Sequence, residues 1–192
     1  MRNLAMSITP GSHAVKTFSG RAIGVLCFSI AVSLTSSAWA LQVRGTTYFE
    51  QVPVLTNAYT SNFSATYSYA TYFFEVAIPQ NSGEPLGGLA ITIPLGIKTA
   101  AYTLPNAGNI KVTDNTGQPI AFQTALQERT VQLTFSQPVA PGQKITVQFY
   151  PMSNPHMGGI FQFGISALPA GSEPHAQFLG FGQLTFYQSA RG

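Results

Sequence analysis

Residues 72–79 have the sequence YFFEVAIP, and this stretch indicates most clearly how the chain folds. Large apolar side chains occupy every second position from Tyr72 to Ile78, with Glu75 between them, before a proline ends the run. Side chains of a β-strand point alternately to its two faces, so the pattern predicts a strand with one buried and one exposed face. We predict that Glu75 lies on the exposed face; the alternative is a buried acid with a raised pKa.

The same alternation of apolar and polar residues recurs along the chain, in runs separated by clusters of glycine, proline and asparagine. These further runs cover residues 89–93, 110–112, 120–122, 131–135, 145–149, 161–165 and 184–186. About eight short strands with such turn signals are typical of an antiparallel sandwich or barrel. Two sheets with one apolar face each bury those faces by packing together. We therefore predict an all-β, antiparallel two-sheet β-sandwich of the immunoglobulin-like kind, in preference to a closed barrel.

Two stretches lack this alternation. Residues 44–70 place tyrosines among serine, threonine and asparagine, and we predict one strand there, followed by a long irregular segment. Residues 171–182 are rich in glycine, and we predict a second loop. Turns are expected at residues 114–117 and 138–142, and a hairpin tip at Glu128-Arg129, because these positions combine glycine, proline and short polar residues or end a run.

The first forty residues have the three parts of a secretion signal. Arg2, Lys16 and Arg21 precede an apolar run at residues 22–34, and Ala38-Trp39-Ala40 supplies the small residues of a cleavage site. An uncleaved membrane anchor would need about 20 apolar residues, more than this run contains. We predict a cleaved signal peptide over residues 1–40, a single domain over residues 41–192, no membrane span after cleavage, and a location outside the cytoplasm: the periplasm, the outer surface or the medium.

The charge of the chain lies mostly in that N-terminal segment. The sequence has nine Lys and Arg and six Asp and Glu, and three of the bases precede residue 22, so the part after residue 40 has six of each. Such a neutral domain lacks the basic surface that phosphate binding needs, which argues against nucleic-acid partners. Cys27 is the only cysteine and would leave with the signal, so no disulfide can stabilise the mature domain.

An ordered series of short motifs runs along the chain from residue 72 to residue 187. They are 72–76 (YFFEV), 78–79 (IP), 82–86 (SGEPL), 138–142 (PVAPG), 154–155 (NP), 158–164 (GGIFQFG), 168–171 (LPAG), 179–182 (LGFG) and 186–187 (FY). Taken together, from about residue 68 to residue 188, they resemble the secreted cyanobacterial proteins grouped as domain of unknown function 2808. The resemblance implies an exported domain without an assigned activity, and it supplies no catalytic residues.

Candidate catalytic groups are few. Glu75 and Glu84 are the carboxylates to consider, but a glycosidase needs two that face one bond, and no pattern pairs these. We expect Glu84 to be a turn residue that accepts backbone N–H groups. Ser166 lies in a predicted strand rather than in the strand–turn–helix setting of an activated serine. We predict no enzymatic activity, no catalytic residues and no cofactor.

Two kinds of ligand remain as alternatives. Thioether and imidazole groups suit copper, and the sequence offers four such side chains in two loop regions: Met152, His156, Met157 and His175. Tyrosine rings can stack on sugars, and the polar N-terminal stretch carries four of them: Tyr48, Tyr59, Tyr67 and Tyr69. We nevertheless predict no metal site, because each of these residues can have an ordinary structural role.

The favoured function is therefore an exported, non-enzymatic cell-envelope protein with a structural or adhesive role. Low charge leaves strand edges open to pairing with another chain, so we expect an envelope protein or glycan partner, or self-association, through a strand edge. The alternative is a periplasmic ligand-binding module for copper or glycan.

Overall fold

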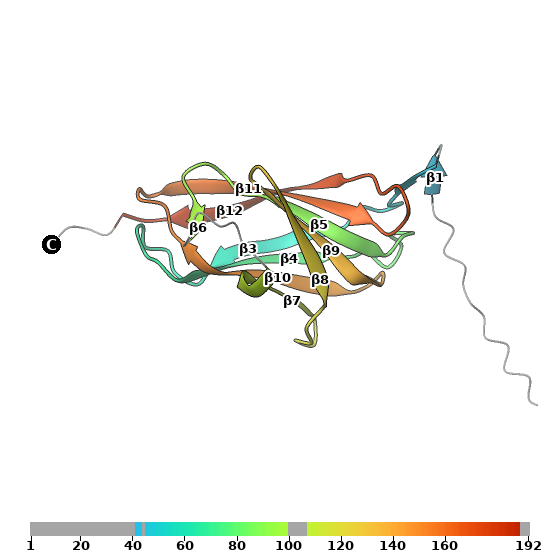
Figure 1. The fold of residues 1–192 in the computed structure, drawn as a ribbon, viewed down its shortest axis with the longest axis horizontal. Coiled ribbons are helices and arrows are strands. Elements are labelled where there is room, and N and C mark those ends of the chain that lie inside the picture. Colours follow the sequence, from blue (N-terminus) through green and yellow to red (C-terminus); the bar gives the residue numbers. More distant parts are fainter. Residues whose placement is uncertain (1–40, 44, 100–106, 189–192) are drawn as a thin grey trace, which may run out of the picture. The chain divides into compact units, whose positions relative to one another are not determined.

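The structure, a computed structural model, describes residues 41–43, 45–99 and 107–188 (Figure 1). These residues belong to one compact unit. The predicted signal peptide, residues 1–40, lies outside them. The strands of the described residues pair antiparallel and form two large sheets and one small hairpin, so the predicted all-β, two-sheet class is confirmed.

One large sheet has the strand order β3-β4-β10-β6, and β7 also pairs with β10. Its strands are β3 (Val54–Thr60), β4 (Ala70–Ala77), β6 (Lys98–Thr99), β7 (Ile110–Asp114) and β10 (Lys144–Ser153). The partner of β10 changes along its length, because β7 pairs with its first half and β6 with its last two residues. We call this the β4 sheet.

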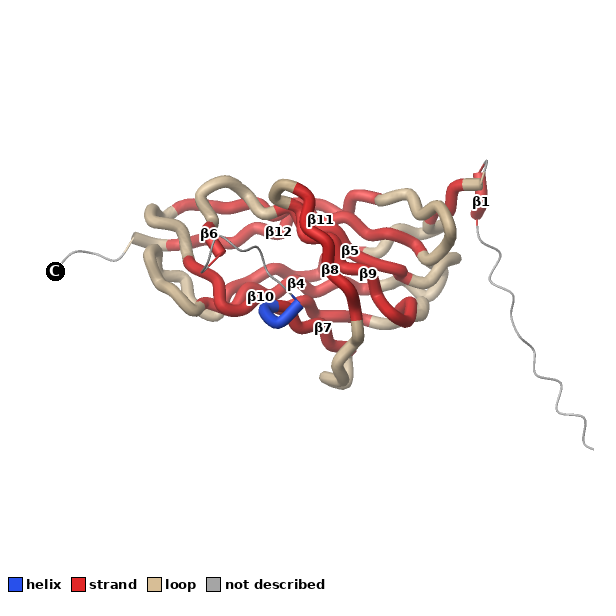
Figure 2. The backbone as a smooth tube through the Cα atoms, viewed as in Figure 1, coloured by secondary structure: helices blue, strands red, loops and turns tan. Residues whose placement is uncertain are grey.

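The other large sheet has the order β12-β11-β5-β9-β8 and is called the β11 sheet. Its strands are β5 (Leu86–Thr92), β8 (Phe122–Gln127), β9 (Thr130–Val139), β11 (Gly159–Pro169) and β12 (Gln177–Phe186). The small hairpin joins β1 (Leu41–Val43) to β2 (Thr46–Tyr48). Figure 2 shows the strands with the single helical turn of the described residues, the 3₁₀ turn η1 (Ala107–Asn109).

The core lies between the two sheets, where their apolar faces meet. The alternation along β4 is reproduced, with every second side chain from Ala70 to Val76 fully buried. Ring contacts link the layers: Phe74 of β4 lies 5.1 Å from Phe163 of β11, measured between ring centroids. Burial of one such large apolar side chain contributes about 1.5–3 kcal/mol, so packing alone can hold a domain without disulfides.

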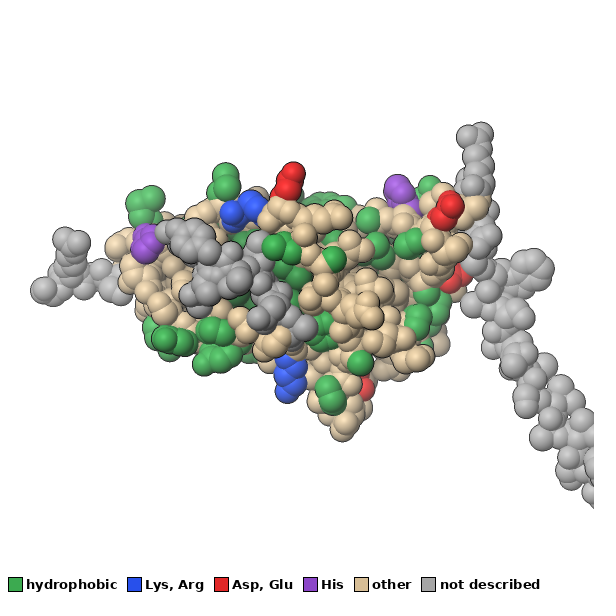
Figure 3. All heavy atoms as spheres, in the orientation of Figure 1, with side chains coloured by type: hydrophobic (Ala, Val, Ile, Leu, Met, Phe, Trp, Pro, Cys, Tyr) green, Lys and Arg blue, Asp and Glu red, His purple; other side chains and the backbone are tan. Residues whose placement is uncertain are grey.

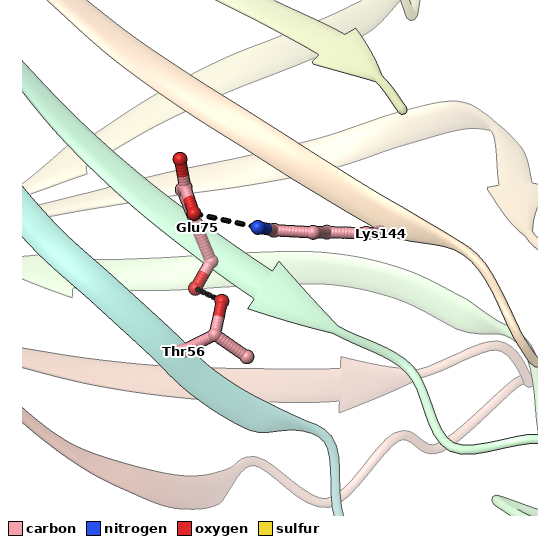
Figure 4. A network of polar contacts seen from close by, with 3 residues as sticks. All are labelled: Thr56, Glu75 and Lys144. Carbon is pink, nitrogen blue, oxygen red and sulfur yellow. Dashed lines mark hydrogen bonds and ion pairs between the residues drawn. The ribbon is translucent and has the colours of Figure 1, made fainter. Parts of the chain in front are cut away.

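Glu75 lies on the exposed face of β4, as predicted (Figure 4). Lys144 of the neighbouring β10 donates to its carboxylate over 2.6 Å, and the hydroxyl of Thr56 on β3 donates to its backbone carbonyl. An exposed pair of this kind contributes at most about 1 kcal/mol. Glu75 therefore joins three neighbouring strands on the outer surface rather than serving as a buried acid.

Two of the three predicted turns form where expected. The carboxylate of Asp114 accepts backbone N–H groups from Thr116 and Gln118, and the pKa of Asp114 is lowered, mainly by the hydroxyl of Thr116 and in addition by these backbone donors. Glu128 forms the tip of the β8–β9 hairpin with a φ of 54°. Strand β9 extends through Pro138 to Val139, so the following turn begins later than predicted.

The prediction of an irregular segment over residues 44–70 is wrong for its middle part. Strand β3 occupies Val54–Thr60 and pairs with β4, with a bulge between Leu55 and Asn57. It is an edge strand with most of its side chains partly or fully exposed, so the sequence shows no alternation there. The rest of the prediction holds, because residues 61–69 form a long loop apart from an isolated bridge at Ser64.

The predicted loop over residues 171–182 is also too long, because β12 begins at Gln177. Glycines at positions 180 and 182 conceal the strand in the sequence. A side chain at Gly182 would come within 2.9 Å of the Cβ atom of Ala58 on β3. This glycine lets the edges of the two sheets approach, a common reason for glycine inside a strand. The opposite edge of the β11 sheet is β8.

Candidate interaction surface

Three chain segments meet at the end of the sandwich where β4 begins: residues 61–69, residues 154–158 and residues 187–188. Backbone hydrogen bonds join all three. Tyr187 donates to the carbonyl of Phe63 and accepts from Ala65, while Thr66 donates to Pro155, all over 2.8–2.9 Å. A further bond runs from the amide of Asn154 to the carbonyl of Tyr67. The loops therefore form one connected structure instead of moving independently.

Asn154 is the polar centre of this structure. Its side-chain amide donates to the carbonyls of Asn62 and Ser64, over 2.9 and 2.7 Å. Its side-chain oxygen accepts from the hydroxyl of Tyr72 over 2.9 Å. Asn154 is only 4% exposed and Tyr72 is fully buried. A buried asparagine with donors and acceptor engaged holds the 61–69 loop against the core.

Tyr72 connects this centre to the apolar interior. Its ring packs edge-on against Phe163 at 5.8 Å and near Phe186 at the same distance. Burial raises the pKa of Tyr72 above its ordinary value. The phenol therefore stays protonated and donates to Asn154 throughout the physiological range.

The 61–69 loop contains two of the three described non-glycine residues with positive φ. Thr66 has a φ of 67° and Tyr69 a φ of 76°. Positive φ is unfavourable for residues with a Cβ, and most of all for a β-branched threonine. Such conformations persist only where surrounding contacts impose them, and they concentrate at functional sites.

The loops present apolar side chains to solvent. The exposed fractions are 52% for Phe63, 43% for Tyr67, 65% for Tyr69, 74% for Met157 and 64% for Tyr187. We call the surface formed by these five residues the aromatic end. Figure 3 shows hydrophobic side chains (green) at the left-hand end of the face in view as well as elsewhere on it. The three loop segments contain no Lys, Arg, Asp or Glu. The surface is thus apolar, uncharged and anchored.

The copper candidates are not brought together. Met152 is buried in the core, whereas His156 and Met157 are exposed in the loop before β11. His175 follows the other end of β11, where its ring lies 4.8 Å from that of Tyr48. The eleven residues of β11 separate the two histidine loops by about 30 Å. Among the described residues, no group of three or more His, Cys, Asp or Glu is placed to hold a metal ion.

Glu84 lies at the end of the sandwich opposite the aromatic end, in the turn between β4 and β5. It is 8% exposed, and burial, followed by the charge of Glu50, raises its pKa. The hydroxyl of Ser82 donates to its backbone carbonyl. The expected turn position is thus found, but among the described residues no backbone N–H donates to the Glu84 carboxylate, and a second carboxylate, that of Glu50, lies near it instead. Glu75 differs, because Lys144 engages its carboxylate.

The four N-terminal tyrosines occupy three different places. Tyr59 stacks on Phe73 on the outer face of the β4 sheet, with ring centroids 4.6 Å apart, and Tyr48 faces the ring of His175. Only Tyr67 and Tyr69 lie at the aromatic end. Sequence reasoning missed the central role of Asn154, and its only signal was an Asn-Pro pair after a strand. It also missed Tyr187, which β12 brings back to the loop.

A family model described as protein of unknown function DUF2808 matches residues 46–186. No curated protein matches the chain. Solved structures similar to the chain include BslA, a bacterial hydrophobin, at 13% identity, covering 72% of this chain and 93% of that one, with a TM-score of 0.42. The Staphylococcus aureus collagen adhesin CNA is 11% identical over 69% of this chain and 49% of its own, with a TM-score of 0.40. The Corynebacterium diphtheriae major pilin SpaA is 21% identical over 62% and 33%, with a TM-score of 0.40.

Proposed function

The chain belongs to the DUF2808 family, and on that premise we propose that it is an exported, non-enzymatic cell-envelope protein that binds another envelope protein through the aromatic end. Its framework in this proposal is an immunoglobulin-like β-sandwich, and residues 1–40 direct its export. The observation that carries the proposal is a cluster of exposed apolar side chains on loops that a buried asparagine holds in place.

Exposed aromatic side chains on an anchored loop have the properties of protein-binding surfaces. Tyrosine and methionine are enriched at the centres of protein interfaces, where their large side chains fill pockets on the partner. A loop that is already ordered loses little entropy on binding, which leaves more of the contact energy as affinity. Hydrogen bonds from Asn154 to two loop carbonyls provide that order here.

The charge of this region favours a protein over a lipid surface. Anionic membranes attract lysine and arginine, and the three loop segments of the aromatic end have neither. In the described part of the chain, no helix has the length and hydrophobicity to span a bilayer. The partner surface is therefore expected to be apolar and near neutral.

The non-enzymatic part of the proposal rests on where the carboxylates lie. Glu75 is paired with Lys144 on the outer β4 sheet, and Glu84 is buried near Glu50 at the far end. Neither belongs to the three loop segments that carry the aromatic end, and the ionisable side chains of those segments are His156 and the tyrosines.

Site-specific photo-crosslinking in the source cells tests the proposal. A photoreactive phenylalanine analogue replaces Tyr69 in one variant and Val54 in the other; Val54 is 51% exposed but lies where β4 ends. We expect one discrete adduct at position 69 and none at position 54. An adduct of twice the chain mass would identify a second copy as the partner. Absence of an adduct at 69, or equal adducts at both positions, would refute the aromatic end as the contact.

A further inference from the structure

A hollow of about 550 Å³ lies on the outer face of the β11 sheet, where β11 and β12 meet the segment that follows β5. Its apolar lining residues are Pro94, Leu95, Ile160, Phe161 and Phe181. The ring of Phe161 itself packs inward against Phe186. The side-chain amides of Gln162 and Gln183 also line it. Its volume falls within the range of small-molecule sites, and it is separate from the aromatic end.

The two glutamines stand side by side in the hollow. Gln162 of β11 and Gln183 of β12 are direct register partners, and both are exposed. Directly opposed residues of antiparallel strands have Cβ atoms about 5 Å apart. Each amide offers two donors and an acceptor, so the pair can bond adjacent hydroxyl groups of one ligand.

An aromatic wall lies beside these amides. Phe181 packs edge-on against Phe178 with centroids 5.1 Å apart, yet the two side chains remain 57% and 56% exposed. Gly164 is the register partner of Phe181. A Cβ atom at Gly164 would lie in van der Waals contact with the two rings, 3.7 and 3.9 Å from one ring carbon of each, so the missing side chain leaves room beside them. Aromatic rings often cover a glycine on a neighbouring strand, which explains why Phe181 lies opposite Gly164. It does not explain why the rings of Phe178 and Phe181 both remain exposed.

The chemistry of the hollow selects an uncharged, hydroxyl-rich ligand. None of its lining residues carries a charge. The guanidinium of Arg129 donates to the carbonyl of Pro94, a lining residue, and to that of Ile93, so this nearby cation already has partners. A lipid tail would bury the two amides without partners. Ring faces beside paired amides fit the apolar and hydroxyl faces of a sugar.

We propose that the hollow lined by Gln162, Gln183 and Phe181 binds a neutral oligosaccharide. The site would hold the sugar against the Phe181 ring while the two amides bond its hydroxyl groups. It uses a different face from the proposed protein contact, so the two proposals succeed or fail independently. A glycan site here would give the protein a second attachment within a polysaccharide-rich envelope.

Titration of the purified protein with three neutral hexasaccharides tests this inference. The probes are cellohexaose, maltohexaose and N-acetylglucosamine hexamer, each followed by amide NMR shifts at millimolar sugar. We expect at least one to shift the signals of Gln162, Gln183 and Phe181 while those of Tyr67 and Tyr69 stay unchanged. No shift with any of the three, or shifts confined to the aromatic end, would overturn the proposal.

Matched variants separate the hollow from the rest of the face. The double variant Gln162→Ala with Gln183→Ala should weaken binding at least tenfold, and Gly164→Ser should weaken it by filling the space beside the rings. The control is Gln123→Ala with Gln127→Ala, which removes two exposed amides from β8 of the same sheet. Equal loss in both double variants would overturn the site. Shifts of the same signals with protein concentration, without sugar, would show that a second copy covers the hollow and would also overturn it.

Discussion

The two ends of the sandwich both bury polar groups beneath loops, but they satisfy those groups differently. At the aromatic end, the side-chain amide of Asn154 donates to two loop carbonyls and its side-chain oxygen accepts from Tyr72. The loop above Asn154 presents apolar rings to solvent. At the other end, Glu84 lies near Glu50, and the buried hydroxyl of Thr47 has no hydrogen-bond partner among the described residues. We call this second region the Glu84 end.

This difference shows where the protein is rigid and where it responds to pH. A satisfied network in a buried site fixes one geometry, which suits a surface that has to be complementary to a partner. Buried or crowded carboxylates oppose folding when ionised, which makes the Glu84 end the pH-sensitive one.

The largest expected effect is at the centre of the aromatic end. Asn154→Ala removes two donors to the 61–69 loop and one acceptor for the buried Tyr72 hydroxyl, so we expect a loss of about 2–3 kcal/mol in unfolding free energy. Urea denaturation followed by circular dichroism measures it. The control Asn57→Ala, at an exposed position of β3, should change stability by less than about 0.5 kcal/mol. Similar values for both would show that Asn154 does not hold the loop.

The next effect concerns the Glu84 end. Gly83 has a φ of 77°, and a Cβ atom there would lie 2.6 Å from Cγ of Glu50. Gly83→Ala should destabilise by about 1–2 kcal/mol, from backbone strain and displacement of the Glu50 side chain. Gly117→Ala separates the two causes, because Gly117 has a φ of 84° but no atom within 4 Å of its Cβ position. The unfolding temperature of Gly83→Ala should be lower than that of Gly117→Ala. The reverse order would contradict the steric argument.

A smaller effect of opposite sign is expected in the 61–69 loop. Thr66→Gly relieves the positive φ of a β-branched residue and keeps its N–H bond to Pro155. Part of the gain is offset by the larger backbone entropy of glycine in the unfolded chain, so we expect stabilisation of about 0.5–1 kcal/mol. Ser68→Gly, at an exposed position of the same loop with no positive φ, should give none. Destabilisation by Thr66→Gly in urea unfolding would show that the loop stores no strain.

The smallest effect is on the pH dependence. Because burial and Glu50 raise the pKa of Glu84 in the folded state, the folded protein binds this proton more tightly than the unfolded chain. Stability therefore falls as pH rises from the unfolded to the folded pKa, and the loss is complete above it. Glu84→Gln should remove this loss and raise the unfolding temperature at pH 7 by about 1–2 °C.

At a pH below both pKa values, Glu84→Gln should leave stability unchanged. Glu75→Gln serves as the comparison, because it removes the ion pair with Lys144 and should lower stability slightly at pH 7. A lower unfolding temperature for Glu84→Gln at pH 7 would mean that its carboxylate makes a stabilising contact.

Prediction from the sequence succeeded where a strand lies inside a sheet and has one buried face. The alternation at residues 72–78 predicted β4 and the exposed position of Glu75, because burial on one side imposes a period of two. It failed for β3, whose edge position weakens that pattern, and for β12, where Gly182 allows the close approach to Ala58. Tyr67 and Tyr69 were noted as candidate sugar-binding residues, but nothing local distinguished them from Tyr48 or Tyr59.

The amino-acid sequence by itself determined the strands with one buried face, the turns at residues 114–117 and 128–129 and the neutrality of the region after residue 40, because these depend on neighbouring residues or on composition. Only the tertiary structure decided which distant segments meet. It placed Asn154 under the 61–69 loop, separated His156 from His175 and set Gln162 beside Gln183. Strand pairing brings residues together across long sequence separations, and no local pattern contains that information.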